Sequence, residues 1–178
     1  IGLFLDVGTK QLAAKTLSYG QPTPVIGNYL QFLLVYNKGA IFGLNPQKLI
    51  PGFPVNQVFG VLSIIAMIIL IVYYRNLRDE DTVARWGVAL IMPGALGNFS
   101  DRILNASKGV VDFIRIGVSD EIYWPIFNFA DIYVTCGVGL LLLSFYLDEK
   151  KRAREAVMTS GDVVSADAAQ DAPTQLEQ

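Results

Sequence analysis

The feature that most constrains the fold is an uncharged apolar run at residues 55–74, VNQVFGVLSIIAMIILIVYY. A helix rises about 1.5 Å per residue, so a run of this length crosses the roughly 30 Å hydrocarbon core of a bilayer. Two further uncharged runs occupy residues 86–99 and 132–147. The chain as a whole is 52% hydrophobic, with a mean hydropathy of +0.41. These patterns predict a protein that crosses the membrane several times.

The composition excludes several classes of site. The chain has no histidine and a single cysteine, Cys136, which rules out His-dependent nucleophiles, zinc sites built on His or clustered Cys, and an intrachain disulfide. Its formal net charge of −2 does not favour a nucleic-acid partner, which calls for a basic face. We therefore expect no metal, no other cofactor and no nucleic acid, and any enzymatic chemistry must come from carboxylates or lysines.

The apolar segments divide the chain into membrane helices and the regions that connect them. The segments are residues 1–14, 55–74, 86–104 and 126–147. The first is too short to span a bilayer, and we expect it to be the outer end of a first helix whose beginning is missing. The connecting regions 15–54 and 105–125 are rich in Pro and Gly, with apolar stretches at 25–36 and 109–116 that favour strands.

Charge near the helix ends predicts the orientation. Lysine and arginine crowd the connector at residues 75–85 and the start of the tail at 150–154. The positive-inside rule places both in the cytoplasm, so the Pro- and Gly-rich regions lie outside. We expect one membrane domain, residues 1–148, followed by a cytoplasmic tail, residues 149–178. The tail is polar and low in aromatic residues, which predicts disorder.

Polar side chains cluster at the predicted outer ends of the apolar segments. Asn98, Asp101 and Arg102 have the i, i+3, i+4 spacing of one helix face. Asn128 and Asp131 share a face in the same way, as do Asp6 and Lys10, so these side chains should converge near the outer leaflet; Gly94 and Gly97 would allow another element to approach closely. Taken one at a time, such residues are explained as helix caps or neutralised charges. Taken together, ionisable residues inside a membrane indicate a functional site.

The carboxylates in this layer outnumber the cations. Lys10 and Arg102 face four acids, namely Asp6, Asp101, Asp112 and Asp131. Two acids close together in a pocket of low dielectric cannot both ionise, so one holds a proton while the other acts as a base. Such a pair could activate water for peptide hydrolysis without histidine or metal. The composition permits this chemistry without establishing it.

Five short motifs resemble, in order, the conserved boxes of lipoprotein signal peptidase, the bacterial signal peptidase II. They are DVGTK (6–10), YNKGAIFG (36–43), GALGNFSDR (94–102), GVVDF (109–113) and FNFAD (127–131). The resemblance implies an intramembrane aspartic endopeptidase that cuts the signal peptide just before a diacylglyceryl-modified cysteine. It implies Asp112 and Asp131 as the catalytic pair. It also implies that further residues bind substrate or shape the site: Asp6, Lys10, Asn37, Gly39, Asn98, Asp101, Arg102, Asn128 and Ala130.

The resemblance also implies a fold and a setting. The fold is that of an all-α membrane protein with four transmembrane helices, a small extracytoplasmic β-sheet cradle and a short interfacial helix. The partners are the lipid-modified prolipoprotein and membrane lipid, and we expect a monomer in the bacterial cytoplasmic (inner) membrane.

Two other classes of function stay open on the residues alone. A small proton-coupled transporter could use Asp101 and Asp131 as a proton relay, which would require acids near the middle of the bilayer. A membrane scaffold without catalysis would use the acids only as caps.

Overall fold

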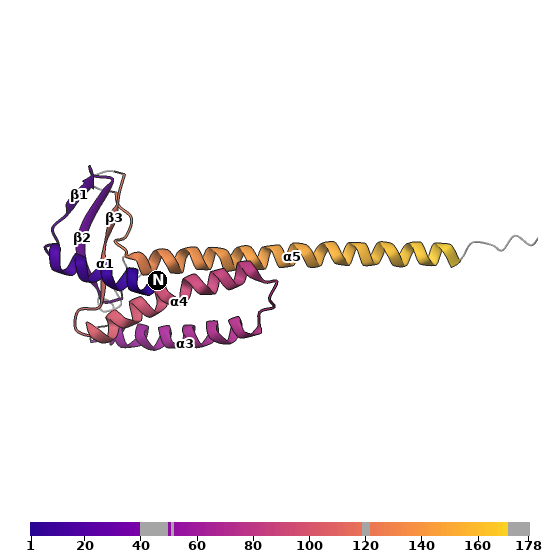
Figure 1. Ribbon diagram of the computed structural model, residues 1–178, viewed down its shortest axis with the longest axis horizontal. Coiled ribbons are helices and arrows are strands. Elements are labelled where there is room, and N and C mark those ends of the chain that lie inside the picture. Colours follow the sequence, from indigo (N-terminus) through magenta and orange to yellow (C-terminus); the bar gives the residue numbers. More distant parts are fainter. Residues whose placement is uncertain (40–49, 51, 119–121, 171–178) are drawn as a thin grey trace, which may run out of the picture. The chain divides into compact units, whose positions relative to one another are not determined.

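The computed structural model describes residues 1–39, 50, 52–118 and 122–170 of the chain. In chain order its elements are α1 (Gly2–Thr16), β1 (Thr23–Ile26), β2 (Leu30–Asn37), α3 (Val55–Asn76), α4 (Thr82–Leu104), β3 (Val110–Ile116) and α5 (Phe129–Gln170) (Figure 1). The chain forms two compact units, Ile1–Leu141 and Leu142–Gln178. The first unit holds every residue of the predicted site.

Two of the described helices are long and apolar enough to cross a membrane. They are α3 and the Phe129–Arg154 part of α5, with mean hydropathies of 2.5 and 1.7. Only 11% of the apolar stretch of α3 is buried in the protein, which fits a helix whose side chains face lipid. Helix α4 fills the third predicted segment, but Asn98, Asp101 and Arg102 near its end lower its hydropathy. The described part of the chain is thus mostly helical, with two candidate spans.

The three strands form one antiparallel sheet in the order β1-β2-β3. The single strand expected at residues 25–36 is instead a hairpin, because Gly27 adopts φ +49° and the backbone N–H of Tyr29 donates to the carbonyl of Ile26 at 3.1 Å. This turn lets the chain fold back, and β1 pairs with β2. The strand expected at 109–116 is confirmed as β3.

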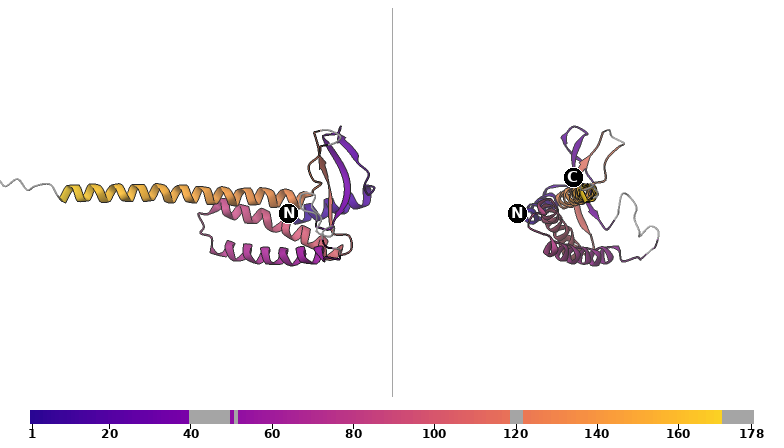
Figure 2. Two further views of the ribbon diagram at one scale, coloured as in Figure 1. Left: turned by 180° about the vertical axis from the view of Figure 1, so that it is seen from behind. Right: turned by 90° about the vertical axis from the view of Figure 1, so that its right-hand side faces the viewer.

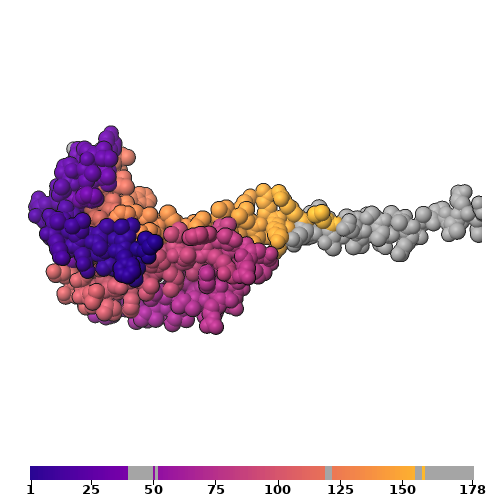
Figure 3. Space-filling model, viewed as in Figure 1, coloured from indigo at the N-terminus to yellow at the C-terminus, as the bar shows by residue number. Residues whose placement is uncertain are grey.

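The sheet is attached to the helices through a small apolar core. Ala13, Phe113 and Ile114 form its buried centre, and Phe32 and Phe129 pack against them. Figure 2 shows the strands at one end of α3 and α4. Helix α1 contacts α4 and β3, and the space-filling view shows it lying directly against the elements beside it (Figure 3). This core holds α1, the sheet and the start of α5 in one arrangement.

Two expectations differ from the structure or fall outside it. The tail expected to be disordered from residue 149 is helical as far as Gln170. Its first part, DEKKRAREAVM, consists mostly of strong helix formers and continues a helix that is already nucleated. The polar composition of the tail alone therefore led to the wrong expectation of disorder there. Residues 171–178 lie outside the described part. The described residues contain no short interfacial helix.

Candidate active site

Asp112 lies in the middle of β3 with only 2% of its surface exposed. The sheet register pairs Val35 with Asp112 and Asn37 with Val110, which brings Asn37 beside the acid. The Asn37 side-chain amide donates to Asp112 Oδ2 at 3.0 Å. The Asn128 side-chain amide donates to Asp112 Oδ1 at 2.7 Å. Both carboxyl oxygens therefore have a fixed hydrogen-bond donor.

Asp131 lies in the first turn of α5, just after Asn128. The Asn98 side-chain amide donates to Asp131 Oδ1 at 2.9 Å, and the Asn128 backbone N–H donates to Asp131 Oδ2 at 3.0 Å. In return the Asp131 backbone N–H donates to Asn128 Oδ1 at 3.0 Å. This reciprocal pair of bonds caps the helix, and the partial positive charge of the helix N-terminus favours a carboxylate there.

Asn128 joins the two acids. It is completely buried, and it donates to Asp112 through its side chain and to Asp131 through its backbone. The two acids also interact electrostatically. Burial, with the negative charge of Asp131 as the second cause, raises the pKa of Asp112 to about 7, against the opposing effect of its hydrogen bonds. Asp112 can therefore hold a proton close to neutral pH.

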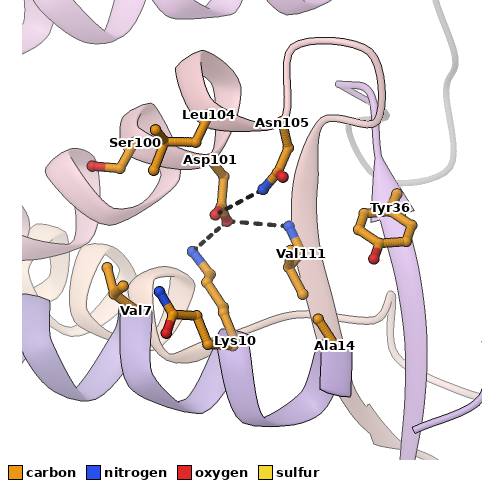
Figure 4. A pocket seen from close by; sticks show the side chains of 10 residues that line it. Val7, Lys10, Ala14, Tyr36, Ser100, Asp101, Leu104, Asn105 and Val111 are labelled. Atoms are coloured by element: carbon orange, nitrogen blue, oxygen red, sulfur yellow. Dashed lines mark hydrogen bonds and ion pairs between the residues drawn. The ribbon is translucent and has the colours of Figure 1, made fainter. Parts of the chain in front are cut away.

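Lys10 organises a second layer of charge beside this pair. Its Nζ lies 2.7 Å from Asp6 Oδ2 and 3.1 Å from Asp101 Oδ2, and it donates to Asn98 Oδ1 at 2.8 Å. Asp101 Oδ2 also accepts the Val111 backbone N–H at 3.2 Å, so Lys10 and β3 meet at one carboxylate (Figure 4). This layer connects α1, α4 and β3.

Asp6 ties the same layer to α5. Its Oδ1 accepts the backbone N–H of Ala130 at 2.9 Å, and Ala130 is completely buried. A Cβ added to Gly97 would collide with Asp6 Oδ2 and would lie 3.6 Å from the Ala130 side chain. Only small residues fit here, as the glycines of this segment predicted.

Gly39 and Arg102 occupy the edge of the network. Gly39 has φ +114°, and its backbone N–H donates to Asn37 Oδ1 at 2.9 Å, which turns the Asn37 amide group toward Asp112. Arg102 donates to the Asn98 carbonyl at 3.0 Å and lies 5.7 Å above the ring of Phe59. Its charge attracts Asp112, Asp131 and Asp101.

The structure thus brings all the predicted site residues into one network. Sequence reasoning missed three contributors: Val111, which supplies backbone groups to Asp101 and Asn128; Phe59, which lies under Arg102; and Asn56. The Asn56 amide donates to the carbonyl groups of Arg102 and Ala106 at 3.0 and 3.1 Å. For Asn56 the signal was its position as a polar residue at the N-terminal end of the longest uncharged apolar run. No sequence pattern pointed to Val111 or Phe59.

Two cavities of about 200 Å³ flank the network. One is lined partly by polar groups of Lys10, Asp101 and Asn105, as Figure 4 shows. The other is apolar, between α1 and the core residues Phe32, Phe113 and Phe129. Within the described residues no group of three or more His, Cys, Asp or Glu side chains is arranged to hold a metal ion.

Comparison with known proteins gives a consistent result. The family model described as signal peptidase (SPase) II matches residues 1–147. A lipoprotein signal peptidase of Clostridium novyi (strain NT) is 38% identical over 146 residues, which is 82% of this chain and 91% of that protein. One of Ectopseudomonas mendocina (strain ymp) is 33% identical over 154 residues, 86% of this chain and 88% of that protein. A solved structure described as a bacterial membrane enzyme, determined by the in meso method at 2.3 Å, superposes with a TM-score of 0.71 and 30% identity over 84% of this chain and 85% of its own.

Proposed function

Because this chain belongs to the signal peptidase II family, it is an aspartic-type endopeptidase that removes signal peptides from prolipoproteins, and we propose that Asp112 and Asp131 are its catalytic pair. Family membership decides against the transporter and the scaffold. The observation that carries the proposal is the shared hydrogen-bond partner: Asn128 donates to both carboxyl groups.

The pair can run the reaction with one proton between its two carboxyl groups. The ionised acid takes a proton from water while the water oxygen bonds to the scissile carbonyl carbon, and the protonated acid gives its proton to the carbonyl oxygen. When the tetrahedral intermediate collapses, the C–N bond breaks and the nitrogen receives the proton first taken from water. A hydroxyl of the intermediate returns its proton to the other acid. Both carboxyl groups end as they began.

We infer supporting roles for the other predicted residues. Asn37, Asn98 and Asn128 orient the two acids through the bonds described above. Asp6, Lys10 and Asp101 hold α1, α4 and β3 in register around them, and Ala130 and Gly39 leave room for close packing. Arg102 supplies positive charge near both acids.

The substrate we propose is a diacylglyceryl-modified prolipoprotein in the bacterial cytoplasmic membrane. The lipid anchor would keep the cleavage site near the outer leaflet, at the level of the polar helix ends. The chain would cross the membrane four times, with α1 and α4 as spans beside α3 and α5. The sheet would lie outside and the C-terminus in the cytoplasm, and the enzyme would act as a monomer in contact with membrane lipid.

Substitution of each acid by its amide tests the catalytic pair. Asp112→Asn and Asp131→Asn keep the size of the side chain but remove its proton transfer, and general acid–base catalysis typically contributes about 10²–10⁴-fold. Each variant should lose at least that factor in cleavage of a lipid-modified prolipoprotein in membranes. Asp79→Asn is the matched control, because the Asp79 side chain is fully exposed on the connector between α3 and α4. Near wild-type cleavage by either active-site variant, with expression intact, would refute the assignment.

A further inference from the structure

The sheet arranges its side chains in rows, and the pairing register assigns each row to one of its two faces. Directly opposite residues on neighbouring strands point to the same face, and successive residues along a strand point to opposite faces. In the row nearest the turn between β1 and β2, Ile26 is opposite Leu30 and Leu30 is opposite Ile116. The segment after β3 pairs antiparallel with it, and the Trp124 backbone N–H donates to the Ile116 carbonyl at 2.7 Å. Four apolar side chains therefore lie side by side on one face.

The neighbouring rows show that this end of the sheet is amphipathic. In the next row on the same face Phe32 is opposite Ile114, and this row is covered because Ile114 packs with Ala13 of α1 in the apolar core. The row between them, in which Gln31 is opposite Arg115, points to the other face. One face of the sheet is thus apolar along both rows, and the other face carries a charge.

The cover that α1 supplies does not extend over the first row. Ile26 is 62% exposed, Ile116 46% and Trp124 65%. A contiguous exposed apolar patch of this kind marks a surface that meets a membrane or another molecule. On the opposite face the Arg115 guanidinium lies 3.4 Å from the centre of the Tyr123 ring, an arrangement that suits contact with water. The two faces are therefore suited to different surroundings.

The attachment of the sheet places its apolar face at the level of the membrane surface. The Val111 backbone N–H on β3 donates to Asp101 at the end of α4 at 3.2 Å. The strands run across the direction of α3 and α4 at that end (Figure 1). In the topology proposed above, this end of α4 lies at the outer leaflet, so a sheet attached there lies at the boundary between lipid and water. Tryptophan is enriched at that depth because its ring is apolar and its N–H is polar.

We propose, on the basis of the topology and function proposed above, that the row Ile26, Leu30, Ile116 and Trp124 lies in the interfacial layer of the outer leaflet and binds the sheet to membrane lipid. Lipid is the occupant because the leaflet surrounds the helix ends to which the sheet is attached. Ile116 lies on the same strand as Asp112. Contact between this row and lipid therefore also fixes the height of Asp112 relative to the bilayer in which the substrate is anchored.

The fluorescence of Trp124 tests this placement. The chain has two tryptophans, so Trp86→Phe leaves Trp124 as the only reporter. The full chain with this substitution is reconstituted, without prolipoprotein, in nanodiscs of phosphatidylcholine brominated near the glycerol end of its acyl chains. Trp124 should lose fluorescence relative to unbrominated nanodiscs, and should lose less when the bromine atoms lie near the methyl end.

The other outcomes of this experiment overturn the proposal. An equal or larger loss with the deep bromine atoms would contradict the interfacial depth. Absence of any loss would show that lipid does not reach this row. Quenching of Trp124 by iodide from the water would then indicate an exposed face, and protection from iodide would indicate cover by a second copy or by another part of the chain.

Two neighbouring residues of β3 provide a matched pair that does not depend on the folding of Trp86→Phe. Ile116→Cys and Arg115→Cys, each combined with Cys136→Ala to remove the single native cysteine, place a nitroxide label on opposite faces of the sheet. The label at 116 should collide more with oxygen, which concentrates in the bilayer, than with a water-soluble nickel complex, and the label at 115 should show the reverse. The same preference at both positions would overturn the proposal. Neither measurement requires cleavage, so failure of the catalytic assignment would appear only in the activity of Asp112→Asn and Asp131→Asn.

Discussion

At the scale of single residues, the environment of Asp112 shows how a strand can hold a carboxyl group whose pKa lies near neutral pH. The strand places the carboxyl group in the interior, where desolvation penalises its charged form. Asn37 and Asn128 fix the direction of both oxygens without supplying a full positive charge. The same two amides therefore orient the carboxyl group and hold its pKa below the value that burial alone would give.

The Asp112 pKa leads to a prediction for the dependence of stability on pH. A pKa raised from 3.8 to about 7 means that the folded protein binds more protons than the unfolded chain between these values. Stability should therefore be greatest at the acidic end of this window and fall as the pH rises toward 7. Thermal melts of the detergent-solubilised protein across this range should show this slope, and Asp112→Asn should reduce it. An identical slope in both proteins would contradict the raised pKa. Cleavage by the wild type should also decline above about pH 7.

At the scale of elements, the contact between α4 and α5 depends on small residues in both helices. A Cβ at Gly94 would lie 2.5 Å from the Ala130 carbonyl oxygen, and one at Gly137 would lie 2.6 Å from the Gly87 carbonyl oxygen. Backbones can approach this closely only where side chains are absent. The close contact sets the position of the start of α5, and with it the position of Asp131 beside Asn98.

Two glycines on α5 provide a matched test of this contact. Gly137→Ala should destabilise the protein by about 1–3 kcal/mol, the usual cost of overpacking. Gly139→Ala, two positions along, meets no atom within 4 Å. It should be neutral or stabilise by up to about 1 kcal/mol through helix propensity. Unfolding in detergent micelles would measure both, and equal effects of the two substitutions would argue against close packing of α4 on α5.

At the scale of the whole molecule, the polar network requires polar and charged side chains in helices, whereas crossing a membrane requires apolar ones. Helix α3 contributes little polar chemistry and is strongly apolar, whereas α4 carries Asn98, Asp101 and Arg102 and is less so. Within the protein, Lys10 contacts Asn98 and Asp101, and Arg102 donates to the Asn98 carbonyl. A helix that carries such a site therefore has a lower hydropathy than one that does not.

The end of the chain gives the prediction at this scale. The family match stops at residue 147, where the apolar stretch of α5 also ends, and the candidate span of α5 is bounded at Arg154. Deleting residues 155–178 should leave cleavage of a prolipoprotein in membranes close to wild type. Deleting residues 143–178 would leave about 14 residues of the span, fewer than the roughly 17 a membrane helix needs, and should abolish insertion. Inactivity of the shorter deletion despite normal membrane levels would show that the tail takes part in function.

The sequence by itself determined the apolar segments, the shared helix faces of the polar residues and the choice of candidate site residues. These depend on hydropathy, on spacing of three or four residues, and on short motifs, all of which are local. The same local reasoning misjudged the hairpin at Gly27, where one turn divides a continuous apolar stretch, and the helical start of the tail.

Only the tertiary structure decided how the site residues connect. Asn128 as common partner of Asp112 and Asp131, and Lys10 as the group that orients Asn98, follow from contacts between elements far apart in the chain; Lys10 and Asn98 are separated by 88 positions. The burial that raises the pKa of Asp112 likewise arises from packing of β3 against α1 and α4. Distances of this kind are set by how the helices and the sheet pack, and no local pattern in the sequence encodes them.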